Sequence, residues 1–139
     1  MKTFPNTRIL MVDDNDIDIA VNRKLLQLAD ITSDIRSFNQ CTKFFEFLET
    51  EAGNDLSLTQ IVLMDIMMPV MNGFECLQQF SPFSEERKKK FVIFMLSSSI
   101  DRNDIRRAEE NPLVRRVLEK PLDIYVLRKL LEQEGLPAE

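Results

Sequence analysis

Four apolar runs in this sequence are followed by residues with reactive or charged side chains: Asp13 with Asp14, Asp65, Ser97, and Lys120. Carboxylates can bind a hard divalent cation or act as nucleophiles, while an ammonium group and a hydroxyl can bind an anion. An isolated aspartate after a strand is more often a turn former or a helix cap. The chemistry therefore depends on whether the fold brings these four positions together.

The run from Ile61 to Met64 is apolar and β-branched at its start, which is typical of a strand buried on both faces of a parallel sheet. Asp65 ends this run at the carboxyl edge of the sheet, where open α/β folds place their ligands. Pro69 excludes a continuing strand, and Asn72-Gly73 is a turn dipeptide that leads into a helix. We therefore expect Asp65 at the end of a rigid strand, beneath a loop.

The rest of the chain alternates between strand and helix patterns. Strands are expected at 8–12, 31–38, 91–96 and 114–118, and helices at 40–49, 74–80, 101–110 and 123–134. A further helix is indicated by Ile17, Val21, Leu25 and Leu28 after Asp16 as its cap, while 84–90 is expected to be a charged connector. Five strands alternating with five helices predict an α/β fold with a parallel sheet covered on both faces. The four polar positions then meet at one edge.

Length and composition limit the possible functions. At 139 residues the chain fits one domain, 1–139 with a core at about 8–134, and we expect no output domain. Its hydrophobic share of 44% and its net charge of −5 indicate a soluble protein and argue against nonspecific nucleic-acid binding. The sequence has no apolar run of membrane-spanning length and no signal-peptide pattern, so we expect a cytoplasmic protein without a membrane association.

Cysteine and histidine usage narrows the chemistry further. Cys41 and Cys76 lie in apparent helices without metal-ligand spacing, and we interpret them as reduced residues. The chain has no histidine. This excludes a phosphohistidine carrier, a histidine-based acid/base enzyme and a typical zinc site.

Taken together, these motifs resemble the receiver domain of two-component response regulators, the CheY-like family. The resemblance spans about 8–134 and rests on Val12-Asp13-Asp14, the stretch from Asp65 to Gly73, Ser97, and Lys120-Pro121. It implies a flavodoxin-like, doubly wound sheet with strand order 2-1-3-4-5. It also implies a single-domain response regulator of a bacterial-type signalling system.

Three carboxylates at one edge repel one another, and a hard divalent cation relieves this repulsion, with Mg²⁺ the usual choice beside phosphate. By resemblance, Asp14 and Asp65 would ligate Mg²⁺, Asp13 would hold it through water, and the backbone carbonyl of Met67 would complete the set. Asp65 would then accept a phosphoryl group as an acyl phosphate. The protein would not be an enzyme acting on an outside substrate.

The resemblance also assigns a switch. Lys120 would contact the phosphoryl oxygens and Ser97 would donate a hydrogen bond to one of them, with Ser98 taking its place if the strand ends one residue later. An ordinary ion pair with the aspartates is the alternative role for Lys120. Val117 stands where the family usually carries Tyr or Phe. The usual aromatic coupling is then either absent or replaced by movement of the loop backbone.

Two residues bear on the lifetime of the phosphorylated form. Met67 and Ser99 stand two residues after Asp65 and Ser97. In the family, the residues at these positions affect how fast water removes the phosphoryl group, and neither Met67 nor Ser99 offers an obvious base for positioning water. We therefore predict slow self-dephosphorylation.

The resemblance implies a sensor histidine kinase or a phosphotransfer protein as donor, and a downstream protein target. The expected docking face is formed by the fourth helix, the fifth strand and the fifth helix, with Arg102, Arg106, Arg107, Tyr125 and Arg128. The main alternative is a receiver-like interaction scaffold that works without phosphorylation. An aspartyl phosphatase is disfavoured by Met67, where such enzymes carry a second aspartate, and a flavin protein by the acidic loop after the first strand.

Overall fold

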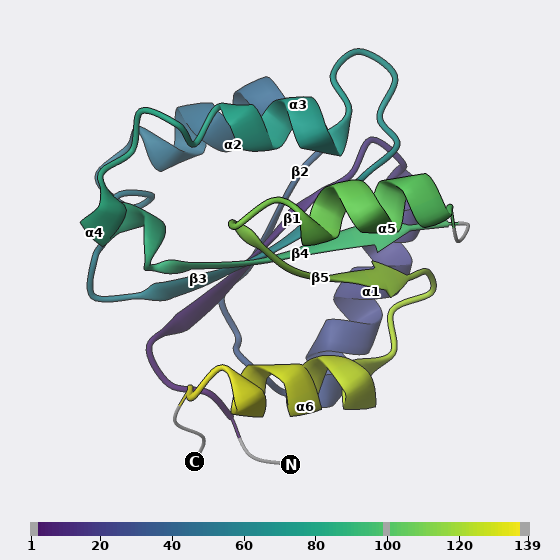
Figure 1. Cartoon of the computed structure of the whole chain (residues 1–139). Helices are drawn as coiled ribbons and strands as arrows, with labels where there is room; N and C mark the ends of the chain where they lie inside the picture. Colours follow the sequence, from purple (N-terminus) through teal and green to yellow (C-terminus); the bar gives the residue numbers. More distant parts are fainter. Residues whose placement is uncertain (1–2, 99–100, 137–139) are drawn as a thin grey trace.

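The computed structural model describes residues 3–98 and 101–136, which form a five-stranded parallel sheet with helices on both faces (Figure 1). The strand order is β2-β1-β3-β4-β5, the flavodoxin-like order that the family resemblance implied. The strands are β1 (Thr7–Val12), β2 (Ile35–Phe38), β3 (Thr59–Asp65), β4 (Phe91–Ser97) and β5 (Val114–Glu119). β2 is shorter than the predicted 31–38.

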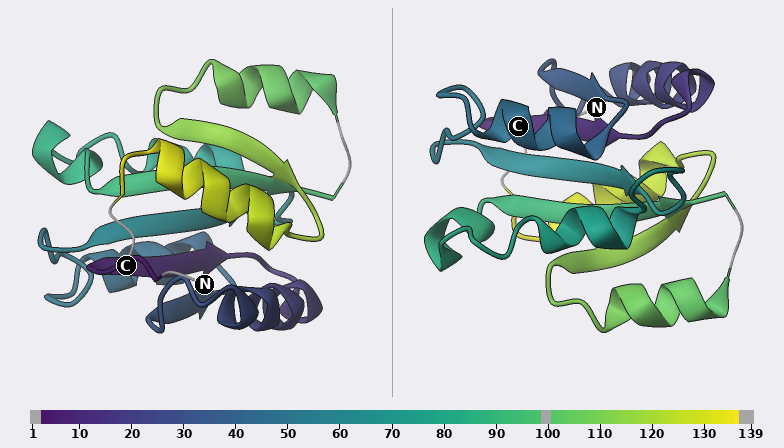
Figure 2. Two further views of the ribbon diagram at one scale, coloured as in Figure 1. Left: turned by 90° about the horizontal axis from the view of Figure 1, so that it is seen from below. Right: turned by 90° about the horizontal axis from the view of Figure 1, so that it is seen from above.

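The helices form a layer on each face of the sheet. They are α1 (Asp16–Ala29), α2 (Cys41–Leu48), α3 (Gly73–Gln78), α4 (Glu85–Lys88), α5 (Arg102–Glu109) and α6 (Ile124–Gln133). Figures 1 and 2 show α1 and α6 on one face, with α2, α3 and α5 on the other. An apolar core lies between each layer and the sheet, so the sheet is covered on both faces, as in other doubly wound folds.

The two cores differ in their chemistry. On the side of α2 and α3, the ring of Phe80 lies 5.0 Å from those of Phe45 and Phe91, both in edge-on contact. On the other side, Leu26 of α1 and Leu127 of α6 are completely buried. Burying each such side chain stabilises the fold by about 1.5–3 kcal/mol. The central strands that end at the polar positions are thus held rigidly between two packed layers.

The short helix α4 was not predicted, so the described residues contain six helices rather than five. Its first turn is capped by Ser84, whose hydroxyl accepts a hydrogen bond from the Arg87 N–H at 3.1 Å. The Arg87 guanidinium lies 4.0 Å from the ring centroid of Phe83 and donates to the Leu48 carbonyl. α4 immediately precedes β4 and therefore lies at the end of the sheet opposite Asp65.

Helix α1 differs from its prediction in its cap and in the face that it buries. Asn15, not Asp16, is the cap, because its side-chain oxygen accepts from the N–H groups of Ile17 and Asp18, both at 3.0 Å. Most of the apolar stripe that indicated the helix faces solvent, with Ile17 74% and Leu28 62% exposed, whereas Leu25 is partly buried against the core. The buried face of α1 carries Asn22, Leu26 and Ala29.

The later helices follow their predictions closely. α3 begins with a capping box, in which Asn72 and Glu75 each accept a hydrogen bond from the other's backbone N–H. α6 is capped by Asp123, and Gly135 beyond its end has the positive φ of 78° expected at a helix stop.

Cys41 and Cys76 form a disulfide, so the prediction of reduced cysteines was wrong. Cys41 opens α2 and Cys76 lies within α3, and the Cα atoms are 5.9 Å apart. The two helices pack on the same face of the sheet, although the cysteines are separated by 35 residues in sequence. This proximity follows from the tertiary packing and leaves no spacing signature.

None of the helices in the described ranges 3–98 and 101–136 has the length and apolar character needed to span a membrane.

Candidate functional site

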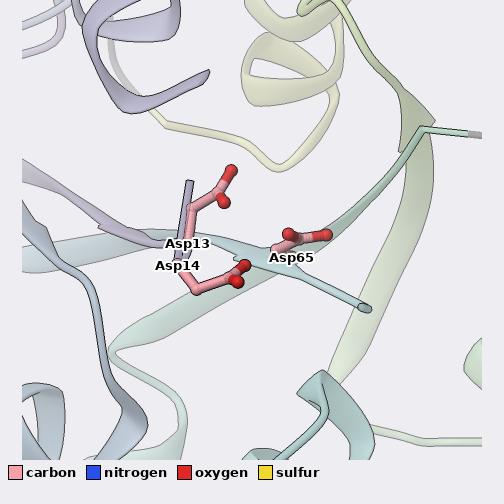
Figure 3. A group of neighbouring side chains, drawn as sticks. All are labelled: Asp13, Asp14 and Asp65. Atoms are coloured by element: carbon pink, nitrogen blue, oxygen red, sulfur yellow. The ribbon is translucent and has the colours of Figure 1, made fainter. Parts of the chain in front are cut away.

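The carboxylates that follow β1 and β3 meet at the carboxyl edge of the sheet (Figure 3). Val12 and Met64 are partners in the parallel register, which places Asp13 beside Asp65 at the ends of neighbouring strands. Carboxylate oxygens of Asp13, Asp14 and Asp65 lie within 4.8 Å of one another. Asp13 and Asp65 are only 3% and 5% exposed, whereas Asp14 is open to solvent.

Backbone groups fix the two buried carboxylates. Asp13 Oδ1 accepts a hydrogen bond from the Asn15 N–H at 2.9 Å, and Asp65 Oδ1 accepts one from the Met67 N–H at 3.2 Å. The loop after Asp65 folds back tightly, since the Gly73 N–H donates to the Ile66 carbonyl at 2.9 Å. A Cβ atom at position 73 would lie 2.5 Å from the Asp65 carbonyl oxygen, so this close approach requires glycine.

Lys120 reaches into the same site from the loop after β5. Its Nζ atom lies 2.9 Å from Asp13 Oδ2, 2.9 Å from Asp18 Oδ2 and 3.2 Å from Asp65 Oδ2. Its backbone N–H donates to the Ser97 carbonyl at 2.8 Å, which joins this loop to the end of β4. The Lys120–Pro121 peptide bond is cis. Asp18 was not among the predicted site residues, because its only sequence signal was its position in the first turn of the helix after Asp14.

Among residues 3–98 and 101–136, the site holds several carboxylates but a single neighbouring ammonium, that of Lys120. Burial, followed by the charge of Asp13, raises the pKa of Asp65 to about 6, although Lys120 opposes the shift. Burial lowers the pKa of Lys120, but hydrogen bonds to Asp13 and Asp18 and the charge of Asp65 outweigh it, so that its pKa is raised. Lys120 is therefore a permanent cation among several carboxylates.

The donor set fits a hard divalent cation. Asp13, Asp14 and Asp65 each offer a carboxylate oxygen to a common space, and oxygen ligands of this kind suit Mg²⁺. Burial first, and then the charge of Asp13, raise the pKa of Asp65, and a divalent cation at this place would favour its ionised form. Receiver domains, which the motifs resemble, typically bind Mg²⁺ in an acidic pocket, and this cluster is of that type.

The other predicted site residues lie around this cluster. Ser97 is the last residue of β4 and is 7% exposed, while Ser98 is exposed and lines a cavity of about 240 Å³ together with Lys120. Val117 is half-buried against the core on the α5 side. The side chain of Met67 is 66% exposed. Ser99 lies outside the described residues.

The residues predicted for a docking face fall into two groups. Arg102, Arg106 and Tyr125 are exposed on α5 and α6. Arg107 is also exposed, but its guanidinium lies 4.3 Å from the ring centroid of Phe74, while the half-buried Arg128 lies over Phe4 and donates to the Ala29 carbonyl. Arg107 and Arg128 therefore contribute to the packing of their helices.

A comparison with protein families matches residues 9–132 to the response regulator receiver domain. The chain belongs to this family. The resemblance drawn from the motifs is thereby confirmed. A similar curated protein is the probable methanogenesis regulatory protein FilR2 of Methanothrix harundinacea (strain 6Ac), which is 28% identical over 125 residues, covering 90% of this chain and 79% of the relative.

Solved receiver structures share the whole architecture. The response regulator receiver protein from Dyadobacter fermentans DSM 18053 superposes with a TM-score of 0.86 at 30% identity, covering 94% of this chain and 99% of that one. The two component response regulator from Cytophaga hutchinsonii gives a TM-score of 0.81 at 28% identity, covering 91% of this chain and 95% of that one. The chain is thus a receiver domain of two-component systems, a family whose members are generally not enzymes in the ordinary sense.

Proposed function

We propose that this receiver domain accepts a phosphoryl group on Asp65 in a Mg²⁺-dependent reaction. The phosphorylated form then changes conformation and either controls a protein partner or relays the group. The observation that carries the proposal is the meeting of Asp65 with Asp13 and Asp14 within 4.8 Å, with the Lys120 ammonium 3.2 Å from Asp65. This arrangement combines a nucleophile, a set of metal ligands and a cation for the phosphoryl oxygens.

In the reaction, a carboxylate oxygen of Asp65 attacks the phosphorus atom of the donor. An acyl-phosphate P–O bond forms as the bond between phosphorus and the donor's nitrogen or oxygen breaks, and the donor keeps that electron pair. Mg²⁺, held by Asp13, Asp14, Asp65 and the backbone carbonyl of Met67, would neutralise the transferring oxygens. Lys120, whose Nζ atom lies 3.2 Å from Asp65 Oδ2, binds these oxygens as a cation.

Phosphorylation acts as a switch through charge. It adds roughly −1.5 to −2 charges at Asp65, which draws the Lys120 ammonium and the Ser97 hydroxyl toward the phosphoryl oxygens. The backbone hydrogen bond from Lys120 to the Ser97 carbonyl couples the loops after β5 and β4. Because Val117 is not aromatic, this backbone connection carries the signal to α5, β5 and α6.

We further propose that a sensor histidine kinase or a phosphotransfer protein supplies the phosphoryl group in the cytoplasm. Two segments that follow the carboxylates in the chain expose apolar side chains: Ile17 and Val21 on α1, and Met67 and Val70 on the loop after β3. A protein donor that buries these side chains gains apolar contact area while its phosphoryl group approaches Asp65. The downstream partner docks on the face of α5, β5 and α6, where Arg102, Arg106 and Tyr125 are exposed.

An intact-mass comparison tests the central step. Wild type, Asp65→Ala and the control Asp55→Ala, which alters an aspartate at the opposite end of the sheet, are incubated with acetyl phosphate, with and without Mg²⁺. We expect one phosphoryl adduct on wild type and on Asp55→Ala, only with Mg²⁺, and none on Asp65→Ala. Absence of an adduct together with absence of Mg²⁺ binding would favour a phosphorylation-independent scaffold.

The same samples test the predicted slow self-dephosphorylation. The exposed side chain of Met67 offers no group that could orient an attacking water. After removal of acetyl phosphate, the adduct should persist for minutes or longer. Loss of the adduct within seconds would contradict this prediction.

A further inference from the structure

One carboxylate beside Lys120 has no part in the reaction described above. Asp18 Oδ2 accepts a hydrogen bond from Lys120 Nζ at 2.9 Å, as short as the bond to Asp13 and shorter than the 3.2 Å contact with Asp65. Asp18 belongs to the first turn of α1, whereas Asp13 and Asp65 follow strands of the sheet. The ammonium is thus shared between the metal-binding cluster and the helix.

The position of Asp18 is built into the start of α1. The Asn15 side-chain oxygen accepts a hydrogen bond from the Asp18 N–H at 3.0 Å, which fixes the backbone of Asp18 above the sheet edge. The side chain of Asp18 is 37% exposed, against 4% for Asp13 and 6% for Asp65. Among the three partners of Lys120, Asp18 alone has substantial access to water.

Lys120 is held by two hydrogen bonds, to Asp13 and Asp18, and by the ion pair with Asp65. A phosphoryl group on Asp65 replaces the Asp65 contact with its own oxygens. An ammonium has three N–H donors, so it can turn more than one of them toward these oxygens only by giving up a second carboxylate. Asp13 is buried, so Asp18 is the partner that can be released and hydrated.

We propose that Asp18 is a positioning residue, which holds Lys120 in the unphosphorylated state and releases it when the phosphoryl group forms. This inference rests on the proposed function. The cavity of about 240 Å³ that Asp18 and Lys120 line together gives the Asp18 carboxylate room to turn toward solvent. Releasing Lys120 costs the free energy of its ion pair with Asp18. Asp18 therefore lowers the affinity of the site for a phosphoryl group and leaves its affinity for Mg²⁺ nearly unchanged.

Two variants separate this role from a general effect of charge. Asp18→Asn removes the carboxylate that competes for Lys120. Asp16→Asn is the matched control, because it removes the same charge from the same helical turn and Asp16 makes no described contact with Lys120 among residues 3–98 and 101–136. Asp18→Glu keeps a carboxylate on the turn and should behave like wild type.

The test is calorimetric titration of the full chain with beryllofluoride, a tetrahedral phosphoryl mimic, at saturating Mg²⁺. Asp18→Asn should bind it about threefold to thirtyfold more tightly than wild type, since one charge-assisted hydrogen bond to a partly exposed group no longer competes. Asp16→Asn should stay within about twofold of wild type, as expected for a screened surface charge. Mg²⁺ affinity without beryllofluoride should change little in either variant, since Asp18 is not part of the three-carboxylate cluster.

The outcomes are distinct. Equal effects of Asp18→Asn and Asp16→Asn, or weaker beryllofluoride binding by Asp18→Asn, would overturn the role of Asp18. If Asp18→Asn changes the thermal stability but not the beryllofluoride affinity, Asp18 has only a structural role, and the proposed positioning role is also overturned. If wild type itself binds no beryllofluoride with Mg²⁺, the proposed function fails and this role with it.

Discussion

The Nζ atom of Lys120 lies 3.2 Å from Oδ2 of Asp65, although the strands that precede the two residues are not neighbours. β4 lies between β3 and β5, so the lysine side chain crosses the end of β4 to reach the aspartate. Both side chains are nearly buried, with 11% and 6% exposure. The contact places a permanent cation where a phosphoryl group on Asp65 would carry its negative oxygens.

Lys120→Met should destabilise the metal-free protein. The substitution leaves Asp13 and Asp65 buried without their cation, and breaking a buried pair in this way costs about 3–5 kcal/mol. Mg²⁺ should restore part of the loss by taking over the neutralisation of the carboxylates. Denaturant unfolding in chelator and in Mg²⁺ measures both effects.

The matched control is Lys129→Met, which alters an exposed lysine on α6. It should change the free energy of unfolding by no more than about 0.5 kcal/mol, with or without Mg²⁺. Similar losses for the two variants would contradict a special role of Lys120 in neutralising the cluster.

In the metal-free protein, the contribution of Asp65 to stability should fall as the pH rises from about 4 to about 6. The pKa of Asp65 is raised to about 6 in the folded state, by burial first and then by Asp13, above its unfolded value of about 3.9. The folded state therefore binds more protons than the unfolded state in this window, so raising the pH favours unfolding. The difference of about two pKa units corresponds to about 3 kcal/mol.

Asp65→Asn removes this contribution, because an amide does not ionise. In chelator it should be more stable than wild type at about pH 7, and the advantage should vanish near pH 4. Chemical denaturation of both proteins across this range provides the measurement. A difference that stays constant with pH would show that the ionisation of Asp65 is not coupled to folding.

Gly73→Ala should weaken Mg²⁺ binding through the backbone. A Cβ atom at this position would lie 2.5 Å from the Asp65 carbonyl oxygen and 3.1 Å from the Ile66 Cα atom, so the end of β3 must shift. We expect a loss of about 1–3 kcal/mol in stability and about tenfold in Mg²⁺ affinity, measured by denaturation and calorimetry.

Gly135→Ala is the control for Gly73→Ala. Gly135 has a positive φ of 78°, and no atom of the described residues 3–98 and 101–136 lies within 4 Å of its Cβ position, so alanine there costs about 1 kcal/mol through local backbone strain. Its Mg²⁺ affinity should equal that of wild type. Equal Mg²⁺ affinities for both glycine variants would contradict the coupling between Gly73 and Asp65.

Reducing the disulfide between Cys41 and Cys76 should lower stability. The bond joins residues separated by 35 positions, and closing a loop of this length restricts the unfolded chain by about 3–4 kcal/mol in the loop-entropy account. Denaturant unfolding with and without a phosphine reductant measures the difference. The Cys41→Ala/Cys76→Ala double variant should be insensitive to the reductant, and an equally insensitive wild type would argue against a stabilising bond.

The sequence predicted those parts of the site that depend on strand ends. Asp13 and Asp65 each follow a continuous apolar run, and parallel strands bring their carboxyl ends to one edge of the sheet. The fold class and strand order followed from the same alternation of strands and helices together with the family resemblance.

Other features depend on tertiary packing and left no local signal. The contact between Asp18 and Lys120 depends on the orientation of α1 about its own axis and on the length of the lysine side chain. The exposed Ile17 and Leu28 indicated the correct helix but not its buried face. Helix α4 has four residues, too few for an apolar periodicity, and a charged segment without apolar spacing suggested a connector.

The most direct test of the central claim identifies the phosphorylated residue chemically. Borohydride converts an aspartyl phosphate to homoserine, so the protein is treated with acetyl phosphate and Mg²⁺, reduced with borohydride, digested and sequenced by tandem mass spectrometry. We expect homoserine at position 65, formed only with Mg²⁺ and absent when a chelator is present during the phosphorylation. Homoserine at another aspartate, or none in a sample that carries the phosphoryl adduct, would contradict Asp65 as the acceptor.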